Sequence, residues 1–234
     1  MRTPPIALQL AFVAILTFVL LCETAAGAVY PTISVTTDYR YNGVSYSDGQ
    51  PVPQVSAYWT APQRFYFGIW SSEIDFKDPG GTSVELDLYA GRDFQVGKFR
   101  LTFETLYTAF PDQDVPGPTY DFVQLKARAR RLLGAWTIGM QTAWTPEASY
   151  GAGPATRVAA ELIDELKPWL SLSGNVGRRW ADMGDDRTYW DVGITLKRNI
   201  IGIDIRYSDT NLDPAGCRLR CDATVTGTVS INFW

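Results

Sequence analysis

The stretch WDVGITLK, from Trp190 to Lys197, shows the pattern that decides the fold. Trp190, Val192, Ile194 and Leu196 alternate with residues that are polar or glycine. Strict alternation with a period of two residues is typical of a β-strand that has one apolar and one polar face. This stretch is therefore predicted to be a strand whose two faces meet different surroundings.

The same alternation recurs along the chain, and the gaps between the runs alternate between long and short. The long gaps are rich in Asp, Gly and Pro and cover residues 42–53, 75–83, 111–119, 145–155, 182–187 and 208–222. The short turns lie near residues 62–63, 96–97, 131–132, 164–167 and 199–200. Transmembrane β-barrels have short turns on the periplasmic side and longer loops outside, so the rhythm favours such a barrel over a soluble sandwich.

About twelve runs can be distinguished. They lie near residues 32–41, 53–61, 64–74, 84–95, 98–110, 120–130, 133–145, 155–163, 168–180, 188–198, 200–208 and 223–234. Many are about as long as the ~9–11 residues that a tilted strand needs to cross a bilayer. The run 155–163 also fits helical spacing at Val158, Leu162 and Leu166, which would lower the number of strands to about ten. We predict an all-β fold: a single antiparallel up-and-down transmembrane barrel of 10–12 strands, with both ends in the periplasm.

The N-terminus resembles an export signal. Arg2 supplies a positive charge, residues 6–21 are apolar, and Ala26-Gly27-Ala28 offers small residues for cleavage. We expect cleavage after Ala28, with residues 1–28 as the signal peptide and residues 29–234 as the barrel. No other stretch approaches the ~18 apolar residues of a transmembrane helix.

Composition excludes several kinds of function. The net charge of −4 gives no basic surface for nucleic acid. The chain has no histidine, so it cannot build a Ser-His-Asp triad or a Cys-His pair. Glu85 and Asp87 are an example of the carboxylate pairs that remain for catalysis, but such pairs are common on polar strand faces. We expect no enzyme, no metal and no cofactor.

Cys217 and Cys221 are the cysteines that would remain after export. An oxidising compartment favours a local disulfide between them, and two free thiols are the alternative. Three residues separate the two cysteines, which excludes the tight redox spacing. Cys22 would leave with the signal peptide.

If the apolar faces meet lipid, the opposite faces line the interior. The ionisable residues predicted to line the pore are Asp38, Arg40, Glu85, Asp87, Arg100, Glu104, Lys126, Arg128, Arg130, Arg179, Asp191, Asp204 and Arg206. Buried charges need partners, and two arrangements satisfy that need. Charges on neighbouring strands can pair along the wall and close the lumen. Alternatively, the acidic strand at Glu85 and the basic strand at Lys126 face each other across water and orient polar solutes.

The predicted outer loops are acidic, and the C-terminal run ends in aromatic residues. The loop carboxylates are Asp48, Asp75, Asp78, Asp112, Asp114, Asp182, Asp185, Asp186, Asp209 and Asp213. They could hold divalent cations against lipopolysaccharide phosphates, or they could simply form solvated turns. At the C-terminus, Phe233 and Trp234 follow an alternating strand and resemble the signal that the barrel-assembly machinery reads. Outer-membrane lipid, lipopolysaccharide, that machinery and a small polar solute are therefore the expected partners.

Four further stretches resemble a known family. They are residues 37–49 (TDYRYNGVSYSDG), residues 70–76 (WSSEIDF), residues 85–91 (ELDLYAG) and residues 207–210 (YSDT). With the cysteine pair and its Cys-Asp-Ala ending, they are similar to the Gcw-type (Gcw_chp) bacterial outer-membrane proteins. The resemblance implies a Gram-negative outer-membrane barrel whose solute, if any, is not established.

Two functions follow from these observations. The favoured hypothesis is a narrow porin-like channel for small polar or ionic solutes, because twelve strands lie between the filled eight-strand barrels and the open sixteen-strand porins. The alternative is a non-conducting structural or surface-binding barrel with a salt-bridged lumen. A soluble periplasmic β-protein is a further alternative.

Overall fold

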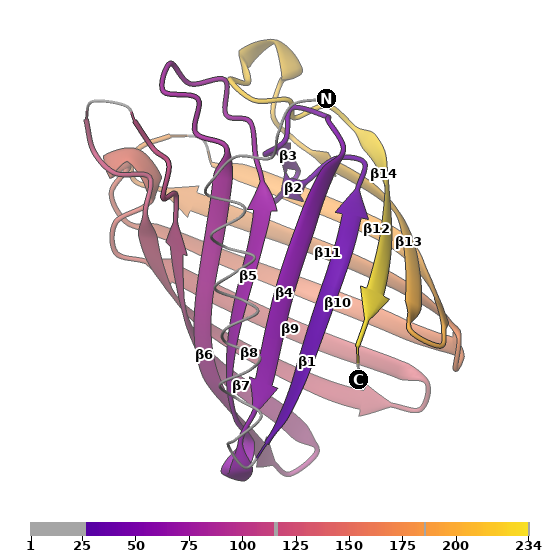
Figure 1. Ribbon diagram of the computed structural model, residues 1–234. Helices are drawn as coiled ribbons and strands as arrows, with labels where there is room; N and C mark the ends of the chain where they lie inside the picture. The colour runs from indigo at the N-terminus through magenta and orange to yellow at the C-terminus, as the bar shows by residue number, and fades with distance from the viewer. Residues whose placement is uncertain (1–26, 115–116, 185, 234) are drawn as a thin grey trace.

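Twelve antiparallel strands close into one barrel in the computed structural model, which describes residues 27–114, 117–184 and 186–233 (Figure 1). The strands are β1 (Ala28–Thr36), β4 (Val52–Thr60), β5 (Phe65–Glu73), β6 (Val84–Val96), β7 (Phe99–Ala109), β8 (Phe122–Leu133), β9 (Trp136–Thr145), β10 (Ala155–Lys167), β11 (Leu170–Ala181), β12 (Arg187–Arg198), β13 (Ile201–Thr210) and β14 (Thr224–Asn232). Each strand pairs with its neighbour along the chain, and β1 pairs with β14 to close the barrel. The predicted all-β barrel of about twelve strands is confirmed.

The connections alternate in length as the sequence predicts. Long connections gather at one end of the barrel and short turns at the other (Figure 1). Both ends of the closed sheet lie at the short-turn end, where Ala28 pairs with Thr60 and the Asn232 amide donates to the Ile200 carbonyl. An even number of strands produces this arrangement.

Three predicted boundaries are wrong. The strand predicted near residues 32–41 is β1, which ends at Thr36. Residues 40–41 belong to a separate small hairpin. The turns predicted near 131–132 and 164–167 lie at 134–135 and 168–169, because β8 and β10 continue further. The helical alternative for residues 155–163 is also wrong. Hydrogen bonds to β9 on one side and β11 on the other hold this segment as strand β10, which overrides its helix propensity.

The outer surface of the barrel is apolar. Val192, Ile194 and Leu196 of β12 are exposed on this surface, whereas the side chain of Asp191 hydrogen-bonds to Arg206 on the lumen side. A wide band of exposed apolar side chains is unusual in a soluble protein and is expected of a surface that meets lipid. Among the described residues, no helix is long and apolar enough to cross a membrane. The predicted signal peptide falls mainly on residues 1–26, outside the described part of the chain.

Small residues on the lumen face make room for tyrosine rings. Tyr189 is the cross-strand partner of Gly177, and its ring occupies the space where a Cβ on that glycine would lie. Tyr89 covers Gly68 in the same manner. Aromatic side chains that cover glycine on a neighbouring strand help to fix strand register.

Replacing Gly177 with alanine is therefore expected to destabilise the barrel. The new methyl group would displace the Tyr189 ring, and overpacking of this kind costs about 1–3 kcal/mol. Urea unfolding of the refolded barrel in lipid vesicles, followed by tryptophan fluorescence, measures the change. Gly174→Ala on the same strand is the control, since its Cβ would meet only the Asp191 carbonyl at an ordinary 3.6 Å. Equal unfolding midpoints for the two variants would contradict the role of the ring.

Candidate functional site

The first long connection folds into the barrel instead of extending outward. We call residues 37–51 the inner segment; it contains β2 (Arg40–Tyr41) and β3 (Val44–Ser45). The turn between these strands is Asn42-Gly43, with φ values of 51° and 82°. Asn-Gly is a favoured pair for a tight hairpin turn, because both positions need positive φ. The hairpin lies inside the mouth of the barrel at the long-loop end (Figure 1).

Asp38 organises the inner segment. Its Oδ1 accepts hydrogen bonds from Ser45 Oγ and Ser47 Oγ, and its Oδ2 lies 3.2 Å from Arg40 Nη1. Arg40 also donates to the Asp222 carbonyl at 2.7 Å. Both charged side chains are almost fully buried, so their pairing offsets the cost of desolvation. The sequence placed Asp38 and Arg40 on the barrel wall; they lie in the inner segment because β1 ends at residue 36.

The connection between β13 and β14, residues 211–223, is hydrogen-bonded to the inner segment. The Ser45 amide donates to the Arg220 carbonyl at 2.8 Å. Cys217 and Cys221 form a disulfide in this connection, with a Cα–Cα distance of 6.3 Å. Cys221 is only 1% exposed. The disulfide thus constrains the loop that contacts the inner segment.

Aromatic packing and one carboxylate hold the inner segment on the side of β5 and β6. The Tyr39 ring packs edge-on against Trp70, with centroids 5.2 Å apart, and Tyr46 packs against Phe76. Tyr39 also donates a hydrogen bond to Glu85 Oε1 at 3.1 Å. Burial, followed by the nearby Glu85 charge, raises the pKa of Tyr39 well above its usual value. The hydroxyl therefore stays protonated and remains a donor.

The opposite side of the hairpin reaches β8 and β10. Gln124 donates to the Tyr41 hydroxyl at 3.3 Å, and Arg157 donates to Asn42 Oδ1 at 3.1 Å. The Arg157 guanidinium also lies 5.8 Å from the centre of the Tyr41 ring. The inner segment thus bridges the barrel from Glu85 on one wall to Arg157 on another. It narrows the lumen at this level.

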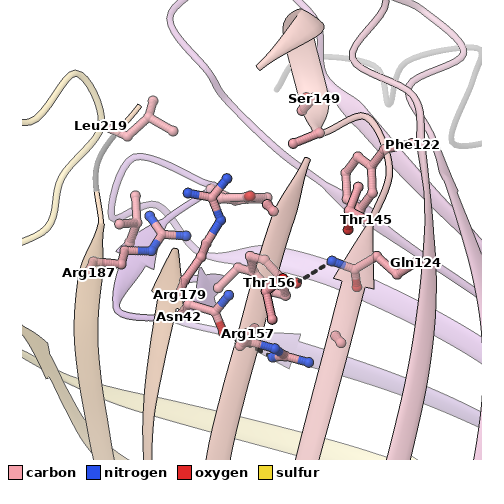
Figure 2. A pocket seen from close by; sticks show the side chains of 16 residues that line it. Asn42, Phe122, Gln124, Thr145, Ser149, Thr156, Arg157, Arg179, Arg187 and Leu219 are labelled. Carbon is pink, nitrogen blue, oxygen red and sulfur yellow. Dashed lines mark hydrogen bonds between the residues drawn. The ribbon is translucent and has the colours of Figure 1, made fainter. Parts of the chain in front are cut away.

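Three cavities surround the inner segment, and all three are lined by Tyr41. The first, of about 220 Å³, lies against β10, β11 and β12 (Figure 2). The second, of about 390 Å³, is bordered by Asp191, Asp204 and Arg206. The third, of about 220 Å³, is bordered by Glu85 and Asp87. Tyr41 therefore borders all three cavities at the long-loop end of the lumen.

The remaining residues predicted to line the pore lie on strands. The register brings them onto two groups of lumen-side positions, one on β6, β7 and β8 and the other on β11, β12 and β13, with β9 and β10 between the groups. These residues are Glu85, Asp87, Arg100, Glu104, Lys126, Arg128, Arg130, Arg179, Asp191, Asp204 and Arg206. Whether solute passes along these residues stays a prediction.

The basic residues of β8 are engaged by side chains of β7, β9 and β10. Lys126 Nζ lies 3.1 Å from Glu104 Oε1, and Arg130 Nη2 donates to Glu161 Oε2 at 2.9 Å. Between them, Arg128 donates to Gln141 at 3.0 Å. This geometry corresponds to pairing along the wall, the first of the two arrangements considered from the sequence. The transverse field expected between β8 and the acidic residues of β6 is correspondingly weakened.

Most of the acidic loop residues in this structure stabilise turns. Asp78 accepts from the Thr82 amide, and Asp112 accepts from the Ser83 amide and hydroxyl. Asp213 caps a short helix. Within the described ranges, no group of three or more Asp, Glu or Cys is placed to hold a metal ion. Asp185 lies outside the described residues.

The sequence reasoning missed a basic cluster at the first cavity. Arg157 and Arg187 project there beside Arg179 (Figure 2). Arg157 lies in the segment whose strand character was uncertain, and Arg187 was assigned to a loop. The alternation of residues 155–159 could have placed Arg157 on the lumen face, but only the strand register reveals that the three arginines are neighbours.

Comparison with solved structures defines the class of fold. A KdgM porin in complex with disordered oligogalacturonate matches with a TM-score of 0.60 at 4% identity, over 88% of this chain and 99% of that chain. A NanC porin matches with a TM-score of 0.60 at 6% identity, over 88% and 100%. LpxR from Salmonella typhimurium matches with a TM-score of 0.51 at 10% identity, over 88% and 99%. The fold is that of porin-like outer-membrane β-barrels.

The family follows from the sequence itself. The family model Gcw_chp, described as a bacterial protein of unknown function, matches residues 23–233, and the chain belongs to this family. The resemblance seen in the sequence is thereby confirmed. A search of curated proteins found no significant match.

Proposed function

We propose that this protein is a narrow channel for small polar or ionic solutes in the outer membrane. The observation that carries the proposal is a closed twelve-strand barrel with a polar, ionisable lumen face and cavities on every side of the inner segment. Rings of charged side chains are a common means of selecting solutes in such barrels. The KdgM porin, with the same fold, provides a precedent for a polar solute. Large solutes are excluded by the inner segment.

Conductance of the refolded mature protein in a planar bilayer tests the proposal. Discrete current steps, with a reversal potential in a salt gradient, are expected of a selective channel. A folded barrel that inserts and stays silent at all voltages would overturn it. Folding is checked independently by the heat-dependent shift of the band on a denaturing gel.

A structural or surface-binding barrel is the second candidate. It is favoured by the ion pairs along the wall and by the fastening of the inner segment on opposite sides. In this role the long loops would contact lipopolysaccharide or other envelope components, and the acidic residues that do not form turns would be available to divalent cations. A folded barrel that does not conduct would favour this second role and would make these loops the candidate binding site.

Removal of Phe233 and Trp234 is expected to reduce insertion into the outer membrane sharply. The Phe233 amide donates to the Pro31 carbonyl at the seam between β1 and β14, where the barrel closes. Trp234 lies outside the described residues. We further propose that the barrel-assembly machinery reads this aromatic end. The amount of heat-modifiable protein in outer-membrane fractions measures the effect, with Trp169→Ala, an exposed turn residue, as the control. Unchanged insertion after truncation would refute this role.

A further inference from the structure

The cavity between the inner segment and β10, β11 and β12 has an unusual arrangement of charge. The register pairs Arg157 directly with Arg179, and Arg179 directly with Arg187. Three consecutive strands thus present arginine at the same level of the barrel. Like charges directly opposite on neighbouring strands are destabilising. All three of these arginines line the same cavity.

The described lining of this cavity contains no acidic side chain. Of the residues described at this cavity, the charged ones are Arg157, Arg179 and Arg187, and none is a carboxylate. Cations elsewhere on the lumen side, such as Arg130 and Arg206, form ion pairs with Glu or Asp. No such ion pair with Arg157 or Arg187 occurs among the residues that the structure describes.

The polar groups of this cavity include several donors that lack acceptors. Arg157 Nε, Arg187 Nε and Asn42 Nδ2 are buried without an acceptor in the described structure. Buried donors in native proteins usually have a partner, and an exception at a cavity calls for a ligand or water. The Tyr41 ring and the hydroxyl groups of Thr145 and Ser149 complete a wall suited to a hydroxylated solute.

We propose that this cavity binds the oxyanion group of a small hydroxylated solute, either a carboxylate or a phosphate. Arginine matches both groups because its planar guanidinium donates two parallel hydrogen bonds. A volume of about 220 Å³ limits the bound part to roughly one sugar-sized unit. Asn42 and Tyr41 of the inner segment form the opposite wall, so bound solute contacts the constriction itself. The inference rests on the proposed function, because it names the class of solute that would use the lumen.

Titration calorimetry of the folded protein in detergent at low salt tests the site directly. The probes are glucuronate, glucose 6-phosphate and glucose. Binding of either acidic probe, weakened by added salt and absent for glucose, supports the site. The acidic probe that binds more tightly shows whether carboxylate or phosphate is preferred. Failure of both acidic probes to bind, or equal binding of glucose, would overturn it.

Matched variants locate the binding. Arg157→Gln and Arg187→Gln are each expected to weaken the affinity about tenfold or more, as the loss of a charged hydrogen-bond donor implies. Arg131→Gln removes the same charge from β8, on the face opposite to the lumen-side Arg130. The Arg131 guanidinium lies over Phe99, away from the cavity, so the affinity should stay unchanged. If one cavity variant does not fold, the other decides. Affinity unaffected by a folded cavity variant would contradict the proposal.

Bilayer recordings separate this inference from the proposed function. Binding by a barrel that remains silent would overturn the channel but support the anion site. Current steps from a barrel that binds neither acidic probe would support the channel and overturn the site. The two proposals can therefore fail independently.

Discussion

Shortening the inner segment is expected to raise the single-channel conductance several-fold. Thr36 and Val52 are cross-strand partners, so residues 37–51 can be replaced by Asn-Gly, which joins these two positions by a two-residue turn. The resulting turn matches the geometry of a tight hairpin. It removes the bridge between Glu85 and Arg157 and merges the three cavities around Tyr41. A wider lumen with fewer aromatic side chains should pass ions more freely.

A milder substitution checks that the increase in conductance comes from the position of the inner segment in the lumen. Asp38→Asn removes the charge that pairs with Arg40 and should loosen the hairpin, giving noisy currents of intermediate size. Asp112→Asn is the control, because Asp112 also holds loop backbone by accepting from Ser83, and its hydrogen bonds in the described structure go to Ser83 and Val84, outside the inner segment. A shortened variant that folds and conducts like the parent would mean that the constriction lies elsewhere.

The strand pattern was readable from the sequence because lipid imposes it. Side chains such as Val192 and Ile194 must be apolar where they meet lipid, and the polar residues between them must face inward. The rhythm of long and short connections gave the closure and the number of strands. These constraints act on single strands or on their immediate neighbours, so they can be recognised in short stretches of the sequence.

The inner segment could not be predicted in the same way. Its Asn42-Gly43 turn indicates a hairpin, but a hairpin in a long loop is as compatible with an outward projection as with an inward one. Its position depends on contacts with distant residues, such as Glu85, Arg157 and the Arg220 carbonyl. Asp38 and Arg40 were consequently assigned to the wall. Polar sequence alone does not distinguish a solvated loop from one that enters a polar lumen.

The basic cluster shows the same limitation at the level of register. Arg157, Arg179 and Arg187 are ordinary polar-face residues when each strand is considered alone. They become a site because the register of β10, β11 and β12 places Arg157 and Arg187 opposite Arg179. A shift of one residue would turn one of them toward lipid. Site prediction therefore needs the strand ends to an accuracy that the sequence did not provide.

Arg206→Met is expected to lower the free energy of unfolding by about 2–4 kcal/mol, in the range typical of breaking a partly buried charge network. The Arg206 guanidinium donates to Asp191 and to both carboxylate oxygens of Asp204, the latter at 3.2 and 3.1 Å. It also donates to Ser173 Oγ at 2.9 Å, and its flat side lies over Gly193, where a Cβ would be 2.8 Å from Cζ. Methionine fills a similar volume but leaves two carboxylates facing each other.

A second substitution identifies the cause of this loss. In Arg206→Met, the carboxylates of Asp191 and Asp204 lose the guanidinium that binds both of them, and their like charges repel each other. Urea unfolding in lipid vesicles measures the stability difference between the parent and the variant. Adding Asp204→Asn to the variant should recover part of the loss at neutral pH, because one of the two charges is then absent. Arg178→Met is the control: its exposed pair with Asp186, at 3.7 Å, is worth about 0–1 kcal/mol. A loss that Asp204→Asn does not reduce would assign the effect to packing against Gly193 instead of charge.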